Sequence, residues 1–255
     1  MKKFVICLFC VFISPMVKAA TEIINWYVDG NTYATTTCQT GGDITLPPAP
    51  TKYGYTFQGW AGYVFLEYIQ SSGTQYIDTG ITINEDSKVD ILYSMTSITS
   101  KPEMPFGTRL MGAVSDAKSG IFRTHGSDTN RVAFGNGAGT NNDIQGYNSS
   151  NTDYNLVVDK NGAVINGTTV ATFPTSSITN TFPMYIFACN TSDTASFLAS
   201  MKLYSFKLYD NNTLVRNMIP AKNASNVVGM YDLVSGQFFT NAGTGEFIAG
   251  PLINQ

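Results

Sequence analysis

Two different patterns meet in residues 45–81 of this chain. The first is TLPPAPTKYGYTFQGW (Thr45–Trp60), a proline-rich turn followed by aromatic side chains that alternate with polar ones. The second is FLEYIQSSGTQYIDTGI (Phe65–Ile81), which reads as a strand and its exit through Asp78-Thr79-Gly80. Alternating runs bounded by Gly and Pro are strand signals. The change of pattern between them predicts a short β-repeat followed by a larger β-sandwich.

Upstream of the prolines, the sequence predicts a hairpin. Ile24, Trp26 and Val28 alternate with polar residues, and Asp29-Gly30 precedes a second β-prone run at Tyr33–Thr37. Asp-Gly between two such runs favours a type I′ turn, because its central residues need positive φ. Trp26 and Trp60 both lie in alternating runs, so both are predicted to be core residues of this small unit.

The segment GGDITLPPAPTKYGYTFQGW (Gly41–Trp60) resembles the second half of the Listeria–Bacteroides repeat, the internalin-type B repeat of bacterial surface proteins. The resemblance covers about Ile23–Trp60. It implies a small β-grasp-like fold and a place at the cell surface or envelope. The chain carries one copy, and Leu252–Gln255 is not a cell-wall sorting motif, so covalent anchoring to peptidoglycan is not expected.

From Phe65 onward, short alternating runs recur between turn signals, the pattern of an all-β sandwich or barrel. Tyr154–Asp159, Ala163–Ile165 and Thr168–Phe173 are separated by Asn161-Gly162 and Asn166-Gly167, which predicts a meander. No long window shows a helical period of 3.6 residues.

Three stretches of this region resemble laminin-G-like, concanavalin A-like domains. The resemblance spans about Phe65–Pro251 and implies a jelly-roll of two antiparallel sheets. We therefore predict a mainly β chain, with a B-repeat-like module at residues 20–62 and a laminin-G-like jelly-roll β-sandwich at residues 63–255. The stretches are YNLVVDKNGAVINGTTVATF (Tyr154–Phe173), GTQYIDTG (Gly73–Gly80) and MKLYSFKLYDNNTLVRNMIPAKN (Met201–Asn223).

Residues 1–19 have the three parts of a secretory signal peptide. Lys2 and Lys3 give a positive start, Phe4–Ile13 is apolar, and Val17-Lys18-Ala19 offers small residues to signal peptidase. The apolar run is shorter than the roughly 20 residues that a membrane span needs. We predict cleavage after Ala19 or Ala20, and hence an exported protein that is secreted or held at the cell envelope or surface.

Composition limits the partners. Losing residues 1–19 would remove Lys2, Lys3 and Lys18 but no acid, so the formal charge would change from −3 to −6. Only 13% of residues are charged, and Lys and Arg do not cluster. A nucleic-acid partner requires a basic surface and is excluded, and binding to an anionic membrane surface loses support for the same reason. The 43% apolar content is enough to build a core.

Two cysteines remain after the predicted cleavage, Cys38 in the module and Cys189 in the sandwich. Export permits a disulfide between them, but a bridge requires close Cα atoms. Two separate thiols are the favoured reading. Neither cysteine has a histidine nearby in sequence, so no nucleophilic or metal role is expected.

The acids give no sign of a glycosidase. A retaining enzyme needs two carboxylates about 5 Å apart, and the Glu-x-Asp-x-x-Glu triplet of the β-glucanase branch is absent. Glu85, Asp86 and Asp90 form the densest acidic group and read as solvated charges flanking a strand start. The remaining glutamates that we weighed are scattered among turn-like contexts, at Glu67, Glu103 and Glu246.

The only histidine, His125, precedes Ser127 and Asp128. A catalytic triad needs a nucleophile oriented toward its base, which neighbours on a turn do not provide, and the chain has no Gly-x-Ser-x-Gly elbow. His125 is therefore predicted to be an exposed loop residue. We expect no enzymatic activity, no catalytic residue and no cofactor.

A metal site is left open. The chain has neither a His/Cys cluster nor an EF-hand loop. The laminin-G resemblance implies one structural calcium at the sandwich rim, for which Asp78 and Asp143 could supply oxygen ligands. Asp78, in Asp-Thr-Gly, is more often a turn former.

The leading hypothesis is binding of an extracellular or envelope glycan or protein through loops at one edge of the sandwich. The Gly/Asn-rich stretch Phe134–Tyr147 is predicted to be an exposed loop. Two alternatives stay open: a divergent glycosidase, and a purely structural envelope protein. Sugars stack on exposed aromatic rings, and the candidates for that role are Tyr63, Tyr68, Tyr147 and Tyr209.

Overall fold

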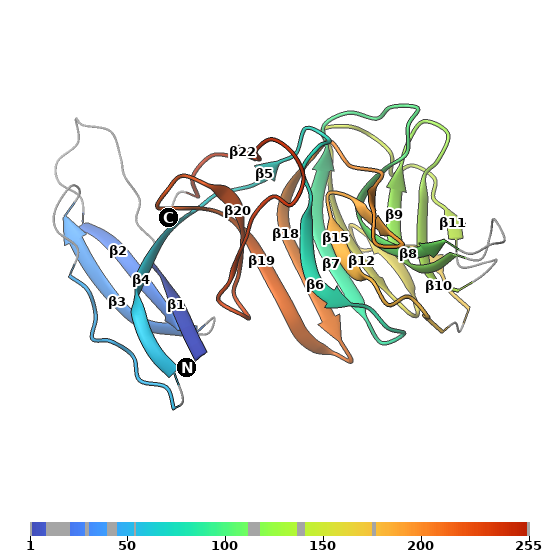
Figure 1. Cartoon of the computed structure of the whole chain (residues 1–255). Helices are drawn as coiled ribbons and strands as arrows, with labels where there is room; N and C mark the ends of the chain where they lie inside the picture. The colour runs from blue at the N-terminus through green and yellow to red at the C-terminus, as the bar shows by residue number, and fades with distance from the viewer. Residues whose placement is uncertain are drawn as a thin grey trace.

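The computed structural model describes residues 2–8, 21–28, 31–39, 45–53, 55–111, 118–136, 141–174 and 177–253 (Figure 1). Within these ranges every regular element is a β-strand, and the strands form two mostly antiparallel sheets. The predicted mainly β class is confirmed, and the arrangement is consistent with a β-sandwich.

The long sheet contains the small module and one layer of the sandwich. Its described strands run in the order β14-β13-β12-β7-β18-β19-β4-β1-β2-β3, and four short strands attach to this path. Their bounds are β14 Thr168–Thr172, β13 Gly162–Ile165, β12 Asp153–Asp159, β7 Lys88–Met95, β18 Met201–Asp210, β19 Thr213–Asn223, β4 Tyr55–Phe65, β1 Lys2–Leu8, β2 Thr21–Val28 and β3 Asn31–Gln39, with β20 Val228–Asp232, β21 Phe238–Phe239, β5 Ile69–Gln70 and β22 Ile248–Ala249 attached.

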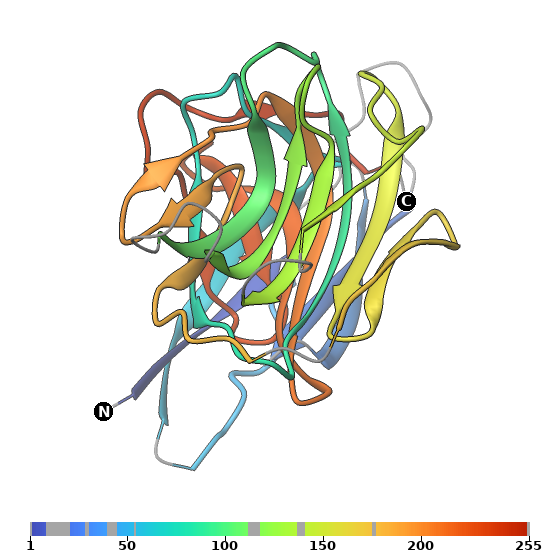
Figure 2. The same cartoon turned by 90° about the vertical axis from the view of Figure 1, so that its right-hand side faces the viewer.

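The short sheet forms the second layer of the sandwich. Figure 2 shows β8, β9 and β10, in green, in front of orange strands of the long sheet. Its described strands run β11-β10-β9-β8-β15-β6, with a two-stranded extension beside β8. Their bounds are β11 Asn141–Asp143, β10 Arg131–Asn136, β9 Lys118–His125, β8 Glu103–Met111, β15 Pro183–Ile186 and β6 Ile77–Thr82, with β16 Cys189–Thr191 and β17 Ala195–Ser196 as the extension.

The core lies between the two sheets because their strands alternate apolar and polar side chains. On β7, Val89 and Ile91 are fully buried while Asp90 between them is not. The ring of Phe106 on β8 lies 6.5 Å from that of Phe206 on β18, which joins the two layers. Each fully buried side chain of this size contributes about 2 kcal/mol through the hydrophobic effect.

The predicted meander is confirmed: β12, β13 and β14 pair antiparallel in sequence order. Asn166 and Gly167 connect β13 to β14 with φ angles of 49° and 81°. Positive φ at both central residues is what a type I′ turn requires. The predicted hairpin of the module is also present, since β2 pairs antiparallel with β3, although Asp29 and Gly30 lie outside the described residues.

Strand β4 belongs to both parts of the molecule. Up to Gly62 it pairs with β1, and from Tyr63 to Phe65 it pairs with β19. The partner of β4 therefore changes between Gly62 and Tyr63, while the division of the chain into two domains there stays a prediction. Tyr63 and Phe65 pack there with Ala221 and Tyr231, the joint cluster. Trp26 is fully buried in the module, as predicted; the side chain of Trp60 is outside the description.

Residues Lys2–Leu8, within the predicted signal peptide, form β1 in this uncleaved chain. β1 pairs parallel with β4 and antiparallel with β2. Residues 9–20 are outside the described ranges, so cleavage after Ala19 or Ala20 stays a prediction.

The Gly73–Gly80 stretch and the C-terminal segment bind each other through the main chain, in a contact that we call the clasp (residues 74–76 and 241–245). Thr244 N donates to Thr74 O at 3.0 Å, and Ala242 N donates to Tyr76 O at 2.9 Å. Asn241 Oδ1 accepts from Tyr76 N at 3.1 Å. The clasp ties the segment before β6, in the short sheet, to the tail that follows β21, in the long sheet.

A second contact supports the same edge. Asp232 is fully buried, and its carboxylate accepts from Asn217 N at 2.7 Å and from the Ser235 hydroxyl at 2.6 Å. Arg216 lies 3.5 Å from this carboxylate and donates to Thr79 O at 3.0 Å. The clasp and the contacts of Asp232 and Arg216 thus hold the two sheets together along the β6 edge of the sandwich.

Candidate functional site

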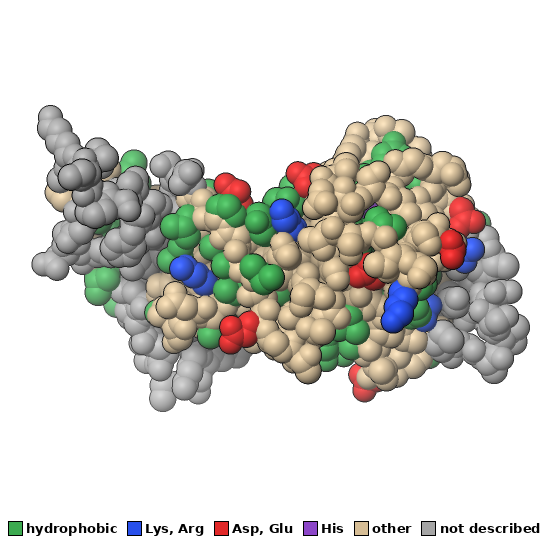
Figure 3. All heavy atoms as spheres, turned by 90° about the horizontal axis from the view of Figure 1, so that it is seen from above, with side chains coloured by type: hydrophobic (Ala, Val, Ile, Leu, Met, Phe, Trp, Pro, Cys, Tyr) green, Lys and Arg blue, Asp and Glu red, His purple; other side chains and the backbone are tan. Residues whose placement is uncertain are grey.

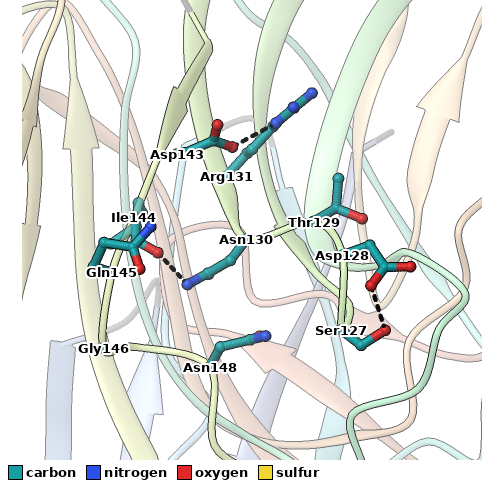
Figure 4. Close-up of a pocket in the computed structure, with 10 residues that line it drawn as sticks. All are labelled: Ser127, Asp128, Thr129, Asn130, Arg131, Asp143, Ile144, Gln145, Gly146 and Asn148. Carbon is teal, nitrogen blue, oxygen red and sulfur yellow. Dashed lines mark hydrogen bonds and ion pairs between the residues drawn. The ribbon is translucent and has the colours of Figure 1, made fainter.

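A polar cleft of about 390 Å³ lies at the opposite edge of the short sheet (Figure 4). One wall is the turn between β9 and β10, and the other is the segment that leaves β11. Ile144 is the one apolar side chain in the lining; the others are amides, hydroxyls, two carboxylates, a guanidinium and a glycine. We call it the amide cleft, and its lining residues are Ser127, Asp128, Thr129, Asn130, Arg131, Asp143, Ile144, Gln145, Gly146 and Asn148.

Asn130 is fixed from behind by a buried arginine. Arg123, on β9, is fully buried, and its Nη2 donates to Asn130 Oδ1 at 2.5 Å and to Tyr147 O at 2.7 Å. Asn130 Nδ2 in turn donates to Ile144 O. Arg123 therefore connects both walls of the amide cleft.

Asn148 is fixed in the same way by His125. The two ring nitrogens of His125 lie 2.8 Å from Asn148 Oδ1 and 2.7 Å from the Tyr93 hydroxyl. Asn148 Nδ2 donates to Gly126 O at 2.8 Å. Because Asn148 Oδ1 can only accept, the His125 proton is assigned to Nδ1, and Nε2 accepts from Tyr93.

The two amides keep unused hydrogen-bonding capacity. Asn130 and Asn148 each use one acceptor position and one N–H in the bonds above, and a carboxamide offers two of each. Each therefore has one acceptor lone pair and one N–H left for a ligand. A site whose polar groups are already held in place loses little conformational entropy on binding.

The prediction that His125 is an exposed loop residue is wrong. His125 ends β9 and is fully buried. Along that strand Ile121, Arg123 and His125 are two residues apart, so they share the face toward the core. The physical reason for its burial is Tyr93 in the facing sheet, whose hydroxyl supplies a partner that the local sequence does not reveal.

Ser127, His125 and Asp128 do not form a triad. Ser127 Oγ donates to Asp128 Oδ1 at 3.1 Å at the exposed rim, while both nitrogens of His125 are engaged elsewhere.

The acidic residues are dispersed in the structure, and one of them, Glu103, lies in a different environment from the one predicted. Asp86 lies at the start of β7 as predicted, with an exposed ion pair to Lys160 at 2.8 Å, and Asp90 is 3.8 Å from Lys207. Glu103, expected in a turn-like context, is instead in β8 and is 8% exposed. Ser200 N donates to its Oε1 at 2.9 Å, whereas its Oε2 has no protein partner.

The two calcium candidates lie at opposite edges of the short sheet, Asp78 in β6 and Asp143 in β11. Asp78 Oδ1 accepts from Gly80 N at 2.8 Å, which is the turn-forming role. Asp143 pairs with Arg131 at 2.7 Å. No group of three or more His, Cys, Asp or Glu side chains suited to a metal occurs in the described ranges.

The four tyrosines differ in their environments. Tyr63 is buried in the joint cluster, 4.9 Å from the Tyr231 ring. Gly250 approaches the ring of Tyr68, and Lys202 lies 4.7 Å above that ring. Lys88 Nζ lies over the Tyr209 ring, 4.0 Å from the ring centroid. Tyr147 packs against the core and Tyr154. Tyr63 is therefore excluded as a stacking surface, and the amide cleft contains no aromatic side chain among its lining residues.

Cys38 and Cys189 are separate thiols, as favoured from the sequence. Cys189 is fully buried, and burial raises the pKa of its thiol to about 12. A thiol in that state is not a nucleophile at neutral pH.

The sequence analysis missed Arg123, Asn130 and Asn148. The available signal was the spacing of Arg123 and His125, which places two polar side chains on one face of a strand. The stretch Phe134–Tyr147 also differs from the expected loop: Phe134 and Ile144 are buried, and Asn141–Asp143 forms β11.

No protein-family model, curated protein or solved structure matches this chain. The resemblances to the B repeat and to laminin-G-like domains therefore stay predictions. In the described part of the chain no helix is long and apolar enough to cross a membrane.

The environment of His125 gives a pH dependence. Burial lowers its pKa well below 6.5, and the nearby charge of Arg123 lowers it further, while the bond to Asn148 opposes the shift. The unfolded chain takes up this proton near pH 6.5. Because the unfolded state then binds more protons, the free energy of unfolding is highest above about pH 6.5 and falls at lower pH by up to about 1.4 kcal/mol per unit.

Urea unfolding between about pH 5 and pH 7 measures this slope. Since His125 is the only histidine, its imidazole NMR signals should keep neutral-form shifts at about pH 6. The variant His125→Gln should lose the slope contributed by the imidazole. An imidazole that titrates near pH 6.5 in the folded protein would contradict the expectation.

Proposed function

We propose that this chain is an exported, non-catalytic protein of a bacterial surface or cell envelope that binds a glycan through the amide cleft. In this proposal a B-repeat-like, β-grasp-like module precedes a laminin-G-like, concanavalin A-like jelly-roll. The sequence resemblances and the predicted signal peptide support the architecture and the export. A protein ligand at the same edge is the variant of this proposal that the sequence also left open.

The observation that carries the proposal is the pair of preorganised carboxamides, Asn130 and Asn148. Each is held by a fully buried side chain, and each keeps one donor and one acceptor position. A sugar hydroxyl is both a donor and an acceptor, so a carboxamide matches its chemistry. The hydroxyls of Ser127 and Thr129 and the amide of Gln145 add further polar groups to the lining.

The same geometry gives less support to a glycosidase. The cleft contains two carboxylates, of Asp128 and Asp143, and both residues are exposed. Asp143 is paired with Arg131. A glycosidase general acid is usually held in an apolar pocket that raises its pKa, and neither carboxylate is in such a pocket.

The test is a glycan array probed with the full chain, expressed for export so that any signal peptide is removed, with calcium and with a chelator. We expect binding that Gln145→Ala weakens about tenfold, the effect of losing one hydrogen bond of about 1.4 kcal/mol. Gln145 is exposed and has no structural bond to lose. Gln237→Ala, at an exposed position on the β20–β21 turn, is the matched control and should bind normally.

The two conditions separate the role of calcium. Loss of binding in chelator would establish a calcium-assisted lectin. Equal binding in both conditions would exclude a role for calcium in binding. No binding on the array with folded protein would contradict glycan binding and favour either a protein ligand or the structural alternative. The observation behind that alternative is β3, the last strand of the long sheet in its described part, which has nine residues and none charged. Uncharged edge strands favour pairing with other chains.

A further inference from the structure

A second cleft, of about 460 Å³, lies beside the clasp at the far edge of the sandwich from the amide cleft. Its walls are the β19–β20 turn Ser225–Val228 and parts of the segment 240–247. We call it the C-terminal cleft. Its volume falls within the range of roughly 300–1,000 Å³ that is usual for ligand sites.

Both walls are held by asparagine side chains. Asn223 Oδ1 accepts from Ser225 N and Val227 N, each at 3.0 Å, and so shapes the first wall. Asn241 accepts from Gly243 N at 2.8 Å and donates to Gly245 O at 2.8 Å, which shapes the second. The cleft is therefore formed before any ligand arrives.

The floor of this cleft is apolar, in contrast to the amide cleft, whereas its walls also carry amide and hydroxyl side chains. Phe247 is 4% exposed and its ring lies 4.8 Å from that of Phe187, so it forms a fixed floor together with half-buried Val228. Val227, at the rim, is 43% exposed and adds apolar surface. Figure 3 shows hydrophobic side chains gathered over the sandwich next to the grey atoms of the module.

The lining of the C-terminal cleft carries a single negative charge. Glu246, which is exposed, is the charged residue among the lining side chains, with no Lys or Arg beside it. Lys222 lies on the same hairpin but does not line the cleft. An apolar floor beside a carboxylate favours a ligand that has an apolar group next to a cation.

We infer that the C-terminal cleft binds a short peptide segment in which an aliphatic side chain neighbours a lysine or arginine. The aliphatic group fits against Phe247 and Val228, and the cation lies near Glu246. This site is separate from the amide cleft and does not depend on its function.

The test is a titration of ¹⁵N-labelled full chain with acetyl-Leu-Lys-amide, with acetyl-Leu-Glu-amide and acetyl-Ser-Lys-amide as comparison probes. We expect saturable amide shifts in residues 225–228 and 240–247 with Leu-Lys. Ser-Lys should bind at least tenfold more weakly, because it lacks about three of the apolar carbons that leucine would bury. Leu-Glu should bind about fivefold more weakly than Leu-Lys, as for one exposed ion pair.

The variant Glu246→Gln should remove the preference for Leu-Lys over Leu-Glu and leave the fold unchanged. Glu67→Gln, at another exposed acid outside the cleft, is the matched control and should keep that preference. Absence of saturable shifts, shifts at other residues, or equal affinity for all three probes would overturn the inference. A failure of glycan binding at the amide cleft would leave these outcomes unchanged.

Discussion

Replacing Arg123 by methionine is expected to lower the free energy of unfolding by about 3 kcal/mol, as is usual for breaking a buried polar network. Arg123 donates to Thr124 O at 2.5 Å and to Arg131 O at 3.0 Å, in addition to its bonds to Asn130 and Tyr147. Methionine fills similar space but donates nothing. The substitution thus leaves four acceptors without their donor, each costing about 1–3 kcal/mol if it stays buried.

An opposing effect limits the loss. Arg123 is a buried cation that has no carboxylate among its partners, and its Nε has no partner in the protein. Burial accordingly lowers its pKa, and removing such a charge recovers part of its desolvation cost. The four acceptors outweigh this gain because Met supplies no substitute donor, whereas apolar replacement is neutral only when both partners of a polar contact are changed.

Urea denaturation above about pH 7 measures the change, and hydrogen exchange should show faster exchange in residues 144–149. Arg123→Lys is the matched control. It keeps the charge but cannot reproduce the planar fork of donors, so it should be destabilised as well, which separates geometry from charge. A methionine variant as stable as the parent would show that the desolvation cost of the cation dominates.

Adding one methyl group at Gly243 should destabilise the sandwich by about 3 kcal/mol, the upper end for overpacking. A Cβ at this position would lie 2.2 Å from Thr74 O, the atom that accepts from Thr244 N. Because the neighbour is main chain, it cannot rotate away. Gly243→Ala must therefore separate residues 74–76 from residues 241–245 and open the clasp.

The same addition at Gly62 is the matched control, since a Cβ there meets nothing within 4 Å. Gly62→Ala should change stability by no more than about 0.5 kcal/mol. Thermal or urea unfolding of both variants measures the difference, and hydrogen exchange at Ala242 and Thr244 reports the clasp directly. Equal stability of the two variants would mean that the clasp does not hold the sandwich edge closed.

Local chemistry made much of the fold predictable. Asn166-Gly167 specifies a turn by itself, because few other pairs adopt positive φ at both positions. The alternation in β7 and β12 likewise fixes which side chains face the core. The change of sequence pattern between residues 60 and 65 did not by itself indicate that one strand, β4, runs through this region and pairs with both β1 and β19.

The amide cleft was not predictable in this way, because its two walls lie on either side of a strand and are joined through the core. Nothing near His125 in sequence indicates that Tyr93, on the other sheet, will bond to its ring. The stretches that resemble known domains, such as Gly73–Gly80, form the clasp and other structural contacts. The residues of the cleft belong to none of the stretches that carry a resemblance.

Strand β4 has a mechanical consequence. Because it runs from the sheet of the module into that of the sandwich without an intervening linker, a pull on the module is carried along the strand. The hydrogen bonds between Tyr63–Phe65 and Ala221–Asn223 would then bear the load together in shear, supported by the joint cluster. In the uncleaved chain β1 completes this connection, because it pairs with both β4 and β2, so there the module is joined to the sandwich through paired strands and not through a flexible tether.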